Sequence, residues 1–172
     1  MSPSLRTPSQ AAAVGGSVDP TRISIRHATD LDGIPITELA GILGYTAAPE
    51  EMARRLHAVL ISSSDLVIVA VDSSNKVVGW LQAHAAHVVE SGFRVEITGL
   101  IVSPESRRCG AGKALVAEAE RWAMAKSAEA IVVRSNVQRE ESHLFYPALG
   151  YAPTKTQKVY RKSLVKAPDP AA

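Results

Sequence analysis

Residues 96–123 read "EITGLIVSPESRRCGAGKALVAEAERWA" and decide the fold. The apolar run that ends at Val102 predicts a strand, and the apolar spacing from Leu115 to Trp122 predicts a helix that continues to Lys126. The turn between them carries two arginines, two glycines and a lysine. A helix that starts in this way leaves its first N–H groups without intrahelical partners and pointing outward. The stretch therefore predicts a phosphate-binding turn.

Three glycine-rich motifs compete for this turn. A P-loop requires Ser or Thr after Lys113 and a glycine in place of Arg107, so it fails at two positions. A dinucleotide fingerprint requires glycine at position 115, which is leucine. The pattern Gln/Arg-x-x-Gly-x-Gly/Ala is met in full by Arg107, Gly110 and Gly112. Because neither glycine has a Cβ, a pyrophosphate can approach this backbone closely.

The rest of the chain alternates strand and helix patterns. We expect strands at residues 22–28, 66–71, 76–89, 94–102, 130–136 and 157–164. Helices are expected from the "TDLD" N-cap signature at residue 29 towards 43, from about 49 to 60, after the phosphate turn, and over 139–149. The first strands are joined as hairpins and the later ones through helices, which predicts an α/β sheet with antiparallel and parallel pairs.

A second block, "VRSNVQREESHLFYPALGY" at residues 133–151, follows the first at a regular distance. The two blocks together resemble the GNAT superfamily of acyl-CoA-dependent N-acyltransferases. The resemblance runs from about Arg22 to Leu164 and is specific from Val95 to Tyr151. It implies one GNAT-like domain over residues 21–165, with a mixed parallel and antiparallel central sheet of six or seven strands flanked by about four helices.

The resemblance also implies an activity. We expect an N-acetyltransferase that moves an acetyl group from acetyl-CoA to a primary amine by direct attack on the thioester. The second block is similar to those of small-molecule acetyltransferases, including aminoglycoside-modifying ones, which favours a small amine. Two alternatives stay open: acetylation of a protein N-terminus or lysine, and a sensor that binds acyl-CoA without turnover.

Several residues are expected to bind the cofactor or to act on it. The turn residues expected to hold the pyrophosphate are Arg107, Arg108, Gly110, Ala111, Gly112 and Lys113. The resemblance assigns the oxyanion contacts to backbone N–H groups around Ile101 and Val102, where the strand should separate from its neighbour, and Gly99 suits a bulge there. It also places Asn136 at the pantetheine arm, and Tyr146 beside the CoA sulfur as the acid that protonates the leaving thiolate.

Glu96 is the candidate general base. An alkylammonium group of pKa about 10.4 is almost entirely protonated at pH 7, so its proton must be removed before attack. A carboxylate in a mostly apolar strand has to face a cleft or a partner. In the family an acid near this place often serves as base, directly or through water. An ion pair between Glu96 and Arg94 or another cation is the equal alternative.

No metal site is expected. His84 and His87 are three residues apart on a strand, so they point to opposite faces and cannot chelate one ion. One of them can still face the acceptor pocket. Tyr45, Glu50 and Glu51 are further candidates for contacting the acceptor, although acids in the first turn of a helix also complement its dipole.

Composition narrows the partners and the compartment. A net charge of +2 gives no argument for nucleic acid, and the basic stretch 155–162 is expected to be a solvated edge strand. No stretch approaches the 20 or so apolar residues of a membrane span. One cysteine, Cys109, favours a reducing, cytoplasmic location. Residues 1–20 are expected to be a disordered arm and 166–172 a flexible tail, and a homodimer stays open.

Overall fold

The computed structural model describes residues 22–42 and 44–164. The chain divides into two compact units, Met1–Arg134 and Ser135–Ala172. Within the described residues, the first unit holds the sheet and helices α1 to α3, and the second holds α4. The predicted arm at residues 1–20 and the predicted tail at 166–172 lie outside the described residues.

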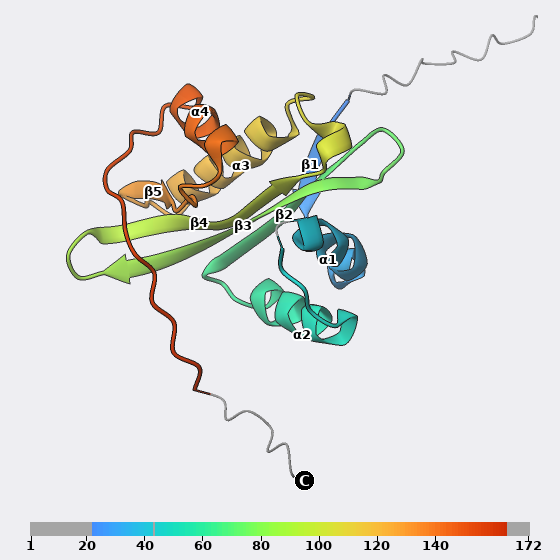
Figure 1. Ribbon diagram of the computed structural model, residues 1–172, viewed down its shortest axis with the longest axis horizontal. Coiled ribbons are helices and arrows are strands. Elements are labelled where there is room, and N and C mark those ends of the chain that lie inside the picture. Colours follow the sequence, from blue (N-terminus) through green and yellow to red (C-terminus); the bar gives the residue numbers. More distant parts are fainter. Residues whose placement is uncertain (1–21, 43, 165–172) are drawn as a thin grey trace, which may run out of the picture. The chain divides into compact units, whose positions relative to one another are not determined.

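The first unit is built on a mixed sheet in the order β1-β2-β3-β4-β5 (Figure 1). Its strands are β1 (Ser24–His27), β2 (Asp65–Val71), β3 (Val77–Val88), β4 (Gly92–Val102) and β5 (Ala130–Val133). The first four pair antiparallel in chain order, and β5 pairs parallel to β4. The predicted mixture of hairpins and one crossover is confirmed. The predicted number of strands is wrong, because the described residues form five strands and not six or seven.

The missing strand is the one expected at residues 157–164. The structure shows residues 151–164 without regular secondary structure, and Val159 and Tyr160 are 87% and 86% exposed. Lys158, Arg161 and Lys162 interrupt the alternation of this stretch. A strand gains its stability from a ladder and from one buried face. A stretch with neither stays irregular and exposed, so the solvated edge strand expected here is also wrong.

Helices cover both faces of the sheet. Helices α1 (Gly33–Ile42) and α2 (Pro49–Leu60) bury Ile36 and Leu56 against Val67, Val69 and Val71 of β2. The alternate side chains of β2 are also buried, and helix α3 (Ala111–Ala125) contacts β2, β3 and β4. The short apolar run at residues 66–71 is therefore a strand buried on both faces, as its pattern predicts.

The turn before α1 is fixed by one carboxylate. A 3-10 turn, Asp30–Asp32, precedes the helix. Asp32 is 4% exposed, and one of its oxygens accepts the backbone N–H of Thr29 at 2.8 Å. Both of its oxygens accept hydrogen bonds of 2.8 Å from the Arg26 guanidinium. The predicted capping signature is confirmed, and the ion pair ties the end of β1 to the start of α1.

The second unit contains α4 (Glu140–Ala148). Its C-terminal end is a Schellman motif: the Tyr151 N–H donates to the Tyr146 carbonyl at 3.1 Å, and the Gly150 N–H donates to the Pro147 carbonyl at 3.0 Å. Gly150 has a φ of +91°, a conformation that glycine adopts without strain. The predicted stop at this glycine is confirmed.

Candidate active site

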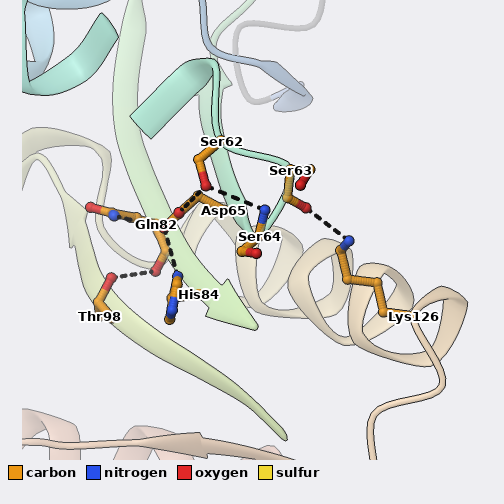
Figure 2. Close-up of polar contacts among 8 residues, drawn as sticks. All are labelled: Ser62, Ser63, Ser64, Asp65, Gln82, His84, Thr98 and Lys126. Atoms are coloured by element: carbon orange, nitrogen blue, oxygen red, sulfur yellow. Dashed lines mark hydrogen bonds and ion pairs between the residues drawn. The ribbon is translucent and has the colours of Figure 1, made fainter. Parts of the chain in front are cut away.

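Strand β4 carries a bulge in its middle. Gln82 pairs with Gly99 and Ala83 pairs with Ile97, which leaves Thr98 as the extra residue. The Thr98 hydroxyl donates to the Gln82 carbonyl at 3.3 Å (Figure 2). A Cβ on Gly99 would lie 2.7 Å from two atoms of the Trp80 ring. The bulge suggested by this glycine is therefore confirmed, and the glycine also makes room for an indole.

Beyond the bulge, β4 has an open edge. Its pairing with β5 ends at Ile97, while its pairing with β3 continues to Val102. The Ser103 N–H donates to the Val78 carbonyl at 2.8 Å. In an antiparallel ladder the bonded and non-bonded pairs alternate. The Ile101 N–H is therefore directed to β3, whereas the N–H groups of Leu100 and Val102 are directed to the edge that β5 has left. Of the two residues expected as donors, Val102 has the suitable direction, and Leu100 joins it.

The phosphate turn follows immediately. A 3-10 turn, Pro104–Ser106, leads into Arg107, and Gly110 caps α3 with a φ of +85°. Arg108 is also left-handed, with a φ of 64°. The first intrahelical bond joins the Ala114 N–H to the Gly110 carbonyl at 2.9 Å. The N–H groups that precede it belong to Ala111, Gly112 and Lys113, and they have no carbonyl one turn earlier in the helix.

Positive charge surrounds these N–H groups. The side chains of Arg107, Arg108 and Lys113 are exposed. The Cys109 thiol donates to the Ser106 carbonyl at 2.6 Å. Three cations and the positive end of a helix dipole therefore lie at one turn, which suits a polyanionic group.

Glu96 lies on β4 before the bulge and is bound to two arginines. One carboxylate oxygen lies 3.2 Å from Arg134 Nε and the other lies 3.7 Å from an Arg94 guanidinium nitrogen. The Glu96 side chain is 21% exposed. The ion pair that the sequence left as the alternative to a general base is present. It leaves a partly open carboxylate that stays close to solvent.

A polar cluster, made of Ser62, Asp65, Gln82 and His84, lies on the adjoining strands (Figure 2). His84 Nδ1 lies 3.2 Å from one Asp65 oxygen, and the Gln82 amide donates to that same oxygen at 3.4 Å. The Ser62 hydroxyl donates to the other Asp65 oxygen at 2.6 Å. His84 also pairs directly with Glu96 across β3 and β4. The cluster therefore joins side chains of β2 and β3 on one face, and Glu96 of β4 lies opposite His84 on that face.

Sequence patterns alone missed most of this cluster. The opposite orientation of His84 and His87 was predictable, and His87 stacks on Phe93 with ring centres 4.6 Å apart. The role of Asp65 was not predictable, because it depends on the pairing of Asp65 with His84 across β2 and β3. An acid at the start of a buried strand was the available signal.

The two candidates in the second unit have local partners. Burial raises the pKa of the Tyr146 hydroxyl, and Arg139 opposes this effect. The Tyr146 ring meets those of Phe145 and Tyr151 edge-on at 5.1 and 5.7 Å. The Asn136 side-chain oxygen accepts the Gln138 N–H at 3.0 Å, an Asx turn before α4.

The acceptor candidates Tyr45, Glu50 and Glu51 lie just before α2 and in its first turn. Glu51 pairs with Arg54 and, at 2.9 Å, with Arg55 on the same helix. Tyr45 is 64% exposed, and Glu50 is exposed.

Among the described residues, no group of three or more His, Cys, Asp or Glu side chains is arranged to hold a metal ion. None of the helices there combines the length and apolar character that crossing a membrane requires.

Comparison with known proteins agrees with this arrangement. Residues 36–151 match the model of the acetyltransferase (GNAT) family. The chain therefore belongs to the GNAT acetyltransferases, and the resemblance drawn from the two sequence blocks is confirmed.

Individual relatives show how far the similarity reaches. The chain is 36% identical over 90 residues to acetyl transferase GW6a of Oryza sativa subsp. japonica, a match that covers 48% of this chain and 22% of that protein. The fold is similar to aminoglycoside 6'-N-acetyltransferase AAC(6')-Ih of Acinetobacter baumannii, with a TM-score of 0.73, 18% identity, and 84% and 100% of the two chains covered. It is also similar to AAC(6')-Iy in complex with CoA, with a TM-score of 0.76, 20% identity, and 87% and 99% covered.

Proposed function

We propose that the protein transfers an acetyl group from acetyl-CoA to a primary amine of a small molecule by direct attack of the amine on the thioester. One observation carries the proposal: the open edge of β4 leads directly into the cationic N-terminus of α3. Donors for a carbonyl oxygen and donors for a phosphate therefore follow each other along one strand–turn–helix segment. Acetyl-CoA carries both groups on one flexible arm.

The cofactor would be held along this segment. Its pyrophosphate would accept hydrogen bonds from the N–H groups of Ala111, Gly112 and Lys113, with Arg107 and Arg108 supplying charge. The thioester oxygen would accept from the Val102 and Leu100 N–H groups, which would also stabilise the oxyanion formed on attack. Asn136 is proposed to contact the pantetheine arm. An aminoglycoside acetyltransferase of similar fold forms a complex with CoA, which supports CoA as the ligand.

The chemistry needs a proton acceptor and a proton donor. The Glu96 carboxylate, partly open on the sheet face, would receive the cationic amine and begin its deprotonation, directly or through water. The neutral nitrogen attacks the thioester carbon, and the tetrahedral intermediate expels the CoA thiolate. Tyr146 is proposed to protonate that thiolate, and the raised pKa of its hydroxyl keeps its proton in place at neutral pH.

Release of free CoA thiol tests the proposal. Acetyl-CoA is incubated with a panel of small amines and with peptides that offer an N-terminus or a lysine, and products are identified by mass. Acetylation of a small amine, with calorimetric binding of CoA but of neither ATP nor NAD, is the expected result. Preferred acetylation of a peptide would overturn the proposed acceptor class. CoA binding without any transfer would instead indicate a sensor.

A further inference from the structure

We infer that His84, oriented by Asp65, is the final acceptor of the proton that leaves the amine. This inference rests on the proposed acetyltransferase function and assigns a further residue to it. The cluster around His84 has the arrangement of a carboxylate–imidazole pair, in which the carboxylate fixes the ring and the second nitrogen faces outward.

The His84 ring is held through its Nδ1 atom, which contacts Asp65. An ionised Asp65 only accepts hydrogen bonds, so the contact of 3.2 Å requires that His84 Nδ1 carries the hydrogen. The Asp65 side chain is 13% exposed and is itself held by Ser62 and Gln82. With Nδ1 protonated, Nε2 of the neutral ring is a lone-pair acceptor. The His84 side chain is 45% exposed, so water reaches it.

His84 also lies next to Glu96, the residue proposed to receive the amine. The two residues are directly opposite on β3 and β4, where Cβ atoms lie about 5 Å apart. Arg94 and Arg134 hold both oxygens of Glu96. Each oxygen of this carboxylate already faces a guanidinium group, which leaves it less free to accept a proton from the amine. In the described part of the chain, the His84 ring contacts a carboxylate and not a cation, which favours the ring as the final acceptor.

The proton balance follows from these roles. The ammonium group gives one proton to His84 Nε2, directly or through Glu96 and water, and becomes a neutral amine. Its lone pair forms the C–N bond while the carbonyl π pair moves to oxygen. When the C=O bond re-forms, the C–S bond breaks and the thiolate leaves. The second nitrogen proton goes to the thiolate by way of Tyr146, and the His84 proton goes to solvent. The products are the amide, CoA thiol and one proton.

The tautomer of His84 gives a test that needs no substrate. Long-range proton–nitrogen NMR of the full chain is expected to show hydrogen on Nδ1 and a bare Nε2 at neutral pH. The D65N variant, which replaces the accepting carboxylate, should lose this preference. A wild-type His84 that carries its hydrogen on Nε2 would overturn the inference, because no lone pair would then face the open side.

Variant kinetics give the second test, with the acceptor amine found by thiol release. H84Q should lower kcat/KM by roughly 10²-fold at pH 7 without changing the KM for acetyl-CoA. The loss should shrink as the pH approaches the pKa of the amine, about 10.4 for an alkylamine, because the amine then arrives neutral. D65N should show the same pattern at smaller size. H87Q is the matched control on the opposite face and should match the wild type.

The outcomes distinguish a failure of the role of His84 from a failure of the proposed acetyltransferase function. A wild type that transfers acetyl groups while H84Q stays as active as H87Q overturns the role of His84 alone. A loss in H84Q that is constant across pH also overturns it, since a structural defect does not depend on the charge of the amine. A wild type that acetylates no amine overturns the proposed function, and the inference with it.

Discussion

Replacing Gly99 by alanine tests whether the bulge of β4 and the Trp80 ring form one packed unit. The added Cβ would lie 2.7 Å from two ring atoms, and ordinary contact begins at 3.4 Å, so the ring or the strand must move by about 0.7 Å. Trp80 packs against the core that α1 and α2 form with β2, which limits its movement. Overpacking of this kind costs about 1–3 kcal/mol of unfolding free energy. Gly99 does not have a left-handed φ, so the cost is steric and not conformational.

A double-mutant cycle isolates that contact. In a Trp80→Leu background the ring atoms are gone, and G99A should then stabilise the protein by about 0.5–1 kcal/mol, because alanine loses less chain entropy than glycine. The effect of the same substitution thus changes sign between the two backgrounds. Urea unfolding followed by circular dichroism measures all four proteins. Gly79→Ala, where a Cβ would lie 2.8 Å from the Ile101 carbonyl, is a control that W80L should not relieve.

Equal costs of G99A in both backgrounds would refute the reasoning. They would mean that the glycine is needed for the backbone of the bulge and not for the indole. Within the proposed function, G99A should also lower the affinity for CoA, since Leu100 and Val102 follow the bulge directly. That effect should likewise disappear when Trp80 is removed.

Three further predictions concern single residues. The pKa of Asp32 is held below its ordinary value, first of all by the Arg26 hydrogen bonds. The ion pair therefore stabilises the fold fully above the unfolded-state pKa of about 3.9, and its contribution is lost as the pH falls through the depressed folded-state pKa. D32N should cost about 2 kcal/mol of unfolding free energy at pH 7, and unfolding measured against pH should show the difference from the wild type narrowing in acid. Y146F should lower turnover roughly 10²-fold and change the unfolding free energy by less than about 1 kcal/mol, and full activity would remove its role as acid. R107A should weaken acetyl-CoA binding in calorimetry by roughly ten- to a hundredfold, whereas R121A, in α3 and away from the turn, should not. Equal loss in both variants would indicate a non-specific charge effect.

Local sequence patterns predicted those elements whose formation depends on residues within the element itself. The strand at residues 66–71, the first turn of α2 at Pro49 and the C-terminal stop at Gly150 depend on periodicity or on one backbone preference. The strand expected at 157–164 failed because its existence depends on a partner and not on its composition. Arg108 in the left-handed region was equally hidden, since arginine has no preference for that conformation.

The candidate site was only half predictable for a related reason. The phosphate turn is continuous in sequence, so its spacing could be read directly. The polar cluster is assembled by register, which the β2–β3 hairpin fixes through its turn. There Asp72 accepts the N–H groups of Ser74 and Lys76, and Asn75 takes a φ of 65°. Next to the turn the register shifts by one residue, since Val71 pairs with Val77 and Ala70 pairs with Gly79, and the turn and this bulge together bring Asp65 opposite His84. No pattern within either strand contains this information.

The bulge explains why the face of β4 could not be assigned by alternation. Glu96 pairs with His84 and Ile101 pairs with Trp80, and His84 and Trp80 share one face of β3. Glu96 and Ile101 therefore share a face although they are five residues apart, whereas strict alternation would put them on opposite faces. The inserted Thr98 inverts the order. Because of this inversion, Ile101 after the bulge faces the same side of the sheet as the Glu96 carboxylate before it. One extra residue thus decides which side chains of β4 can act together.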